Sequence, residues 1–105
     1  MKTKLASGRM EKRCAMAVRL HIKSLDRTQW VETAVTQNVS LFGARILVEN
    51  AWGTGERITL QLSSGGDPWA ARVIYSQELR NGEIAIGVQL EKACPNWAGR
   101  NGGSG

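Results

Sequence analysis

The sequence predicts an all-β domain: a small antiparallel barrel of six strands, preceded by a flexible basic arm. Three observations support this prediction. Apolar and polar residues alternate with a period of two, turn-forming residues recur at short intervals, and no long segment has the period of a helix. A chain of 105 residues has room for one domain with one core. We expect the sheet to close, because closure hides the edges of short strands.

Six segments have the pattern of strands. The first is the clearest, because Val18, Leu20 and Ile22 alternate with polar residues. The expected strands are residues 18–23, 30–37, 43–49, 57–62, 69–76 and 83–90. Turn-forming residues separate them, and Asn81 followed by Gly82 is the strongest hairpin signal. We expect the barrel to span residues 14–99, between an arm of residues 1–13 and a disordered glycine-rich tail of residues 100–105.

The four tryptophans are unusually many for this length, and we interpret most of them as packing residues. Trp69 and Trp97 lie beside strand patterns, so we expect them in the barrel core or plugging its end. Trp52 lies in a turn that contains glycines, where we expect partial exposure.

The positive charge is concentrated at the front of the chain. The net charge is +5, and residues 1–27 hold eight of the fourteen lysines and arginines but only two of the nine acidic residues. A basic arm on a nearly neutral body indicates attraction of an anion to one place. We do not expect nucleic acid as the partner, since a groove that follows several phosphates needs cations on the strands themselves.

The chain does not have the residues of an enzyme. Its one histidine, His21, alternates onto the polar side of the first strand, where we expect it at the surface. Cys14 and Cys94 lack metal-ligand spacing, so we expect reduced thiols, with Cys14 packed at the start of a strand. Without a nucleophile and base, a carboxylate pair or a metal set, we expect no catalysis and no cofactor. No apolar stretch approaches the roughly 18 residues of a membrane span, and no signal peptide is evident, so we expect a cytoplasmic protein.

Two motifs point to a ligand. Arg9 and Arg13 form an RxxxR pair, whose guanidinium groups offer planar forks to phosphate oxygens. With nine arginines in the chain, such a pair arises by chance about half the time. Asn38, Ser40 and Gly43 form an NxSxxG motif between two expected strands, which arises by chance roughly one time in twenty. The two motifs together, in this order, are uncommon by chance.

On these motifs the chain resembles a PilZ domain, the bacterial receptor module for cyclic di-GMP. The resemblance covers about residues 8–99. It includes the strand patterns at residues 55–62, 71–75 and 87–90, and the terminal Pro-Asn-Trp at residues 95–97. Asn38 stands where the family more often has aspartate. The resemblance implies a six-stranded antiparallel barrel, in agreement with the strand count reached from the alternation.

The resemblance also implies the ligand and the site residues. Arg9 and Arg13 would pair with the phosphates, reach guanine O6 and N7, or stack on the purine, and the assignment between them is open. Asn38 and Ser40 would offer polar groups to a base edge or a phosphate, and Gly43 would let the ligand approach the backbone. The expected function is a cyclic di-GMP receptor that changes its arm conformation on binding and signals to an unidentified partner protein. Two alternatives stay open: a PilZ-like adaptor that has lost the ligand, and a small barrel that binds single-stranded RNA.

Overall fold

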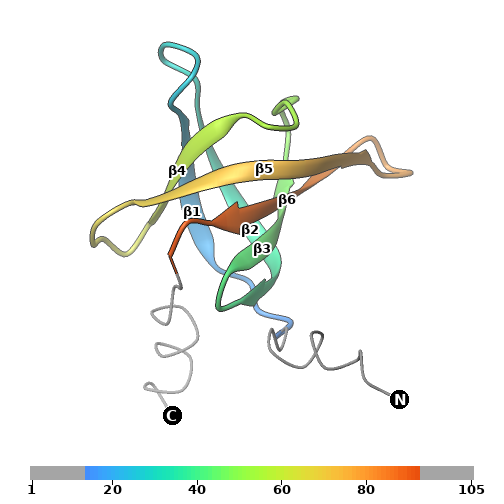
Figure 1. Cartoon of the computed structure of the whole chain (residues 1–105). Helices are drawn as coiled ribbons and strands as arrows, with labels where there is room; N and C mark the ends of the chain where they lie inside the picture. The colour runs from blue at the N-terminus through green and yellow to red at the C-terminus, as the bar shows by residue number, and fades with distance from the viewer. Residues whose placement is uncertain (1–13, 93–105) are drawn as a thin grey trace, which may run out of the picture.

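A closed barrel of six antiparallel strands is formed by residues 14–92, which are the residues that the computed structural model describes (Figure 1). The strands are β1 (Arg19–Ser24), β2 (Val31–Ser40), β3 (Gly43–Val48), β4 (Arg57–Leu62), β5 (Trp69–Glu78) and β6 (Ile84–Leu90). Their order around the barrel is β1, β2, β3, β6, β5 and β4, and β4 pairs with β1 to close it. The predicted fold class is therefore confirmed.

Alternating side chains fill the barrel interior. In β1, Leu20 and Ile22 are completely buried, whereas Arg19, His21 and Lys23 point to solvent. Burial of one such aliphatic side chain contributes roughly 1.5 to 3 kcal/mol, so this alternation drives folding of the barrel. The predicted surface position of His21 is confirmed.

Two strands are longer than the sequence predicts. The sequence predicts that β2 ends at residue 37, before the NxSxxG motif, yet Asn38 and Ser40 both remain paired with β3. β5 continues to Glu78 because it pairs with β6 beyond the barrel wall. The hairpin at Asn81 and Gly82 is confirmed, and Gly82 takes the left-handed φ of 88° that this turn needs.

Two predicted environments are wrong. Trp52 is 1% exposed, because its loop folds over one end of the barrel and its indole Nε1 donates a hydrogen bond of 2.9 Å to Glu32 Oε1. Cys14 is exposed, since only its backbone is paired with the barrel. Trp69 is half-buried and packs against the core. Trp97, Cys94, the arm of residues 1–13 and the tail of residues 100–105 lie outside the described residues.

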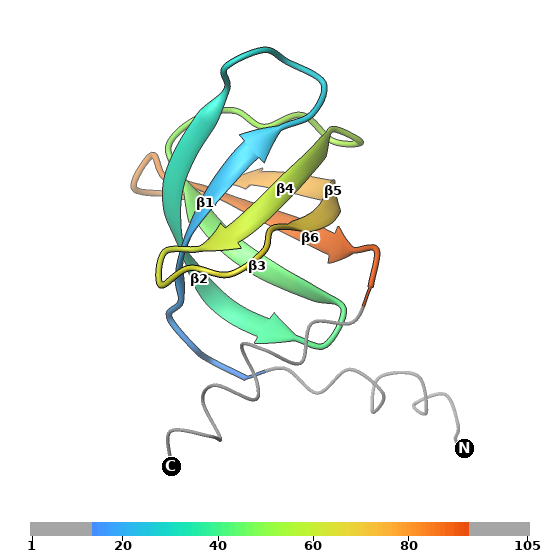
Figure 2. The ribbon, with the colours of Figure 1, turned by 90° about the vertical axis from the view of Figure 1, so that its left-hand side faces the viewer.

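The two ends of β2 define the two ends of the barrel. The β1–β2 turn lies at one end, and the β2–β3 turn, which carries the NxSxxG motif, lies at the other (Figure 2). At that end Asn38, Ser40 and Gly43 are all held by the pairing of β2 with β3.

Candidate functional site

Asn38 lies on the outside of the barrel at an irregularity in β2. The register between β2 and β3 shifts by one residue between Thr36 and Asn38, which is a β-bulge. Asn38 is half-buried and stands opposite Arg45 of β3. Because bulges re-aim side chains, the local backbone sets the direction of this amide.

Ser40 and Gly43 close the β2–β3 turn. They are paired in the strand register, Ser40 is 2% exposed, and its hydroxyl donates a long hydrogen bond of 3.4 Å to the Gly43 carbonyl. A Cβ on Gly43 would meet the Val88 carbonyl oxygen, so this glycine has a packing role within the barrel. The three NxSxxG residues thus lie together at one end of β2.

The segment that follows the RxxxR motif is attached to the barrel at the NxSxxG motif. Cys14 and Val39 exchange two backbone hydrogen bonds, each of 2.9 Å. Val39 lies between Asn38 and Ser40 in the chain, and Cys14 directly follows Arg13. Arg9 and Arg13 themselves lie outside the described residues.

Residues 14–18, which we call the arm root, have a second attachment to β2. The Thr36 hydroxyl donates a hydrogen bond of 2.6 Å to the Met16 carbonyl and accepts one of 2.9 Å from the Val18 amide. The Thr36 amide also donates to the Val18 carbonyl at 3.0 Å. The arm root therefore runs along β2 with contacts on both sides of the bulge.

An arginine that sequence reasoning missed lies beside Asn38. The Arg45 guanidinium donates hydrogen bonds to Gln37 Oε1 at 2.7 Å, Tyr75 Oη at 3.0 Å and Gln77 Oε1 at 3.1 Å. These three partners orient it across the outer face of β2, β3 and β5. Their spacing in the sequence carries no signal for this cluster, because only the strand register brings them together.

The Tyr75 ring covers Gly87 of the neighbouring strand. A Cβ on Gly87 would collide with three carbons of this ring, so only glycine allows the tyrosine to lie where it does. Tyr75 nevertheless keeps 38% of its surface exposed. Together with Arg45 it forms an aromatic and cationic surface next to Asn38, and such surfaces stack on bases.

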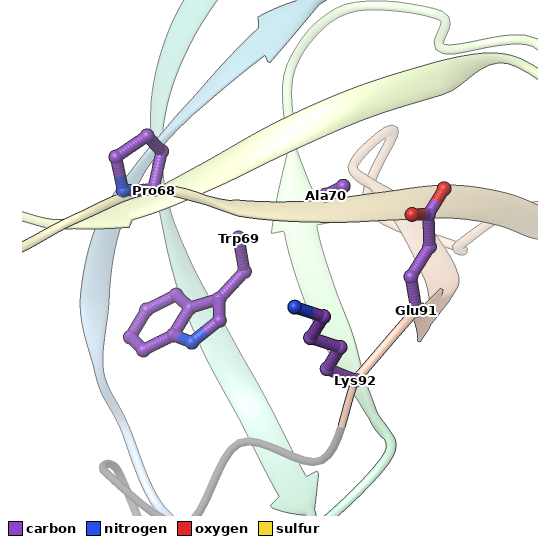
Figure 3. A pocket seen from close by; sticks show the side chains of 5 residues that line it. All are labelled: Pro68, Trp69, Ala70, Glu91 and Lys92. Carbon is purple, nitrogen blue, oxygen red and sulfur yellow. The ribbon is translucent and has the colours of Figure 1, made fainter.

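Two cavities lie near the start of β5 and the end of β6. One, of about 290 Å³, is lined by Pro68, Trp69, Ala70, Glu91 and Lys92. Figure 3 shows the Trp69 indole and the Lys92 side chain facing the same space. Of the predicted site residues that lie within residues 14–92, which are Asn38, Ser40 and Gly43, none lines it.

The other cavity, of about 350 Å³, adjoins the NxSxxG turn. It is lined by Arg72, Gln89, Leu90 and Glu91. Gln89 is paired with Gly43 on one side and with Arg72 on the other. Arg72 therefore lies two strands away from Gly43, the glycine of the motif.

A separate polar cluster holds the opposite end of the barrel. Glu56 is 7% exposed, and its carboxylate accepts hydrogen bonds from Arg27, Ser24 and the Gly53 amide at 2.6 to 2.9 Å. Burial raises the pKa of Glu56, but these hydrogen bonds outweigh it and hold the pKa below its usual value. The Arg27 guanidinium also stacks on Trp30, 3.4 Å from the ring centroid. Because both carboxylate oxygens of Glu56 accept hydrogen bonds from within the protein, we assign this cluster to stability.

Residues 14–92 contain no group of three histidine, cysteine or acidic side chains arranged to hold a metal ion. Within the same residues, no helix is long and apolar enough to cross a membrane.

Comparison with known proteins gives one family and one fold. The model of the PilZ domain family matches residues 7–93. Among solved structures, the inhibitor of motility (MotI/DgrA) from Bacillus subtilis is similar, with a TM-score of 0.60 and 10% sequence identity. The similarity covers 91% of this chain and 46% of that one, so the present chain spans less than half of its length. At this identity the likeness shows the fold alone. No curated protein matches the chain.

Proposed function

The chain belongs to the PilZ domain family, and from this premise we propose that it is a receptor for cyclic di-GMP. In this proposal Arg9 and Arg13 of the arm, together with Asn38, Ser40 and Gly43, hold the nucleotide. The receptor has no catalytic step and needs no cofactor. The bound arm then presents a new surface to a partner protein, and we propose that this takes place in the cytoplasm.

The observation that supports the proposal most directly is the pair of hydrogen bonds between Cys14 and Val39. Cys14 directly follows Arg13 in the chain and is paired with Val39, the residue between Asn38 and Ser40. Twenty-four residues separate Arg13 from Asn38 in the chain, yet Cys14, the residue after the first motif, is bonded to Val39 within the second motif. A ligand bound by the second motif is then within reach of the first.

The residue types near Asn38 suit the two chemical parts of a cyclic dinucleotide. The guanines present hydrogen-bonding edges and flat faces, and the phosphates carry negative charge. An amide at Asn38 complements an edge, and the exposed side of Tyr75, next to Arg45, complements a face. Arginine forks from the arm complement the phosphates.

Signalling in this proposal follows from the thermodynamics of the arm. Ordering a chain segment costs roughly 1 to 2 kcal/mol per residue, and a basic arm with little apolar sequence gains little from the barrel alone. Two arginine forks on a doubly charged ligand offset that cost. Occupancy and arm position are coupled as a consequence.

Calorimetric titration tests the proposed function. We expect cyclic di-GMP to bind saturably and cyclic di-AMP to bind more weakly, because guanine and adenine present different edges. A short single-stranded RNA serves as the third titrant. No binding of cyclic di-GMP would contradict the proposal and favour the ligand-free adaptor, whereas binding of the RNA with a steep salt dependence would favour the RNA-binding barrel.

A further inference from the structure

Thr36 is the residue that bonds the arm root to β2 through its side chain. It is 2% exposed, and its hydroxyl acts as both donor and acceptor, to the Met16 carbonyl and from the Val18 amide. In a regular antiparallel pair the Val18 amide would donate to a backbone carbonyl of β2. Here the threonine hydroxyl takes that place and also reaches the carbonyl of Met16, two residues further along the arm root.

The two attachments of the arm root to β2, at Thr36 and Val39, lie on either side of Asn38 along the strand. Thr36 holds the root on one side of the bulge, and Val39 holds it on the other through Cys14. Between the bonded residues Cys14 and Met16 the root has one residue, and between Val39 and Thr36 the strand β2 has two. The path of the root past Asn38 is therefore determined by where these two points hold it.

We propose that Thr36 is a positioning residue for the ligand site: its hydroxyl fixes the arm root so that Arg13 emerges beside Asn38. This inference rests on the proposed function, since it concerns how the same ligand is held. Thr36 does not touch the ligand. It acts by reducing the number of paths that the arm takes from the barrel, which lowers the entropy lost when the ligand binds.

The hydroxyl is the chemically necessary part of this residue. Valine has nearly the same shape but would leave the Met16 carbonyl and the Val18 amide without a partner, whereas serine keeps the hydroxyl and loses only a methyl group. Thr33 provides a matched control, because it lies on the same strand, is exposed, and bonds to His21 instead of to the arm root.

The experiment compares Thr36→Val, Thr36→Ser and Thr33→Val with the parent chain by two measurements. The first is hydrogen exchange at the amides of Cys14, Val18 and Val39 without ligand. The second is titration with cyclic di-GMP. For Thr36→Val we expect faster exchange at these amides and affinity weaker by about tenfold or more, the size expected when such hydrogen bonds are lost. We expect Thr36→Ser and Thr33→Val to match the parent chain.

The outcomes separate this inference from the proposed function. A parent chain that does not bind cyclic di-GMP contradicts the proposed function, while the exchange data still test whether Thr36 holds the arm root. A parent chain that binds, with Thr36→Val binding equally well, overturns the positioning role. If Thr36→Val is unfolded, Thr36→Ser decides: parent-like affinity and exchange support the role of the hydroxyl, and a clear loss of affinity overturns it.

Discussion

A Cβ atom on Gly43 would stand 2.7 Å from the carbonyl oxygen of Val88. The backbone of β6 thus approaches β3 at this point more closely than any side chain on residue 43 allows. Since the contact is with a backbone atom, it is not relieved by a rotamer change. The glycine of the NxSxxG motif is therefore required by barrel packing whether or not a ligand is bound.

Gly43→Ala should destabilise the barrel by roughly 1 to 3 kcal/mol, as overpacking typically does. Urea unfolding followed by tryptophan fluorescence measures this. Gly53→Ala is the matched control, because a Cβ there would lie an ordinary 3.7 Å from its nearest neighbour, Glu56 Oε1. Equal stability of the two variants would contradict the packing role.

Arg9→Ala and Arg13→Ala should each weaken cyclic di-GMP binding by about ten- to over a hundred-fold without unfolding the barrel. The reason is the loss of a charge-assisted pair, on the order of 1.5 to 3 kcal/mol. Lysine at either position should restore little affinity, because it lacks the planar fork. Arg19→Ala, which removes an exposed arginine of β1, is the control for charge alone. Parent-like affinity in both arm variants would overturn the site assignment.

Asn38→Ala should weaken binding of cyclic di-GMP and leave weak, salt-dependent attraction of simple anions unchanged. This follows if Asn38 contacts a base edge, because base contacts specify and phosphate contacts do not. Calorimetry at two salt concentrations separates the two effects. Asn50→Ala, which removes an exposed amide near the other end of the barrel, serves as the comparison. Equal affinity of the parent chain for cyclic di-AMP and cyclic di-GMP would show that no guanine edge is read.

Limited digestion with trypsin should cut the ligand-free chain rapidly after Arg9, Lys12 and Arg13. Saturating cyclic di-GMP should slow these cuts strongly, because an arm held on the barrel is a poor protease substrate. Mass spectrometry of the fragments identifies each site, and cleavage after Arg19 reports on the barrel itself. Arm cleavage at the same rate with and without saturating ligand would mean that the arm is not the moving part.

Lowering the pH should destabilise the barrel, in part because the carboxylate of Glu56 becomes protonated. Its pKa is lower in the folded chain than in the unfolded one, so the stability it contributes is present above the usual glutamate pKa of about 4.3 and is lost as the pH falls through the lowered value. Glu56→Gln should reduce stability by about 1 to 3 kcal/mol at neutral pH and flatten the fall in acid. Glu78→Gln, at an exposed end of β5, should change neither. Parallel pH profiles for the parent chain and Glu56→Gln would contradict this account.

Local chemistry in the sequence determined the strands and their turns. Leu20 and Ile22 alternate with exposed residues because a strand turns successive side chains to opposite faces, and this periodicity is visible without coordinates. The spacing of Asn38, Ser40 and Gly43 was visible in the same way. The sequence also placed this motif near the junction of two strands, although Asn38 and Ser40 belong to β2 itself.

Strand register decided the remaining features, because pairing joins residues that are far apart in the chain. Trp52 has the local sequence of an exposed turn but becomes buried, since its loop folds onto the end of the barrel and Glu32 accepts its N–H. Arg45 and Tyr75 become neighbours only because β3, β6 and β5 are adjacent. The attachment of Cys14 to Val39 arises likewise from backbone hydrogen bonds, which every residue type except proline makes and which therefore leave no mark in the sequence.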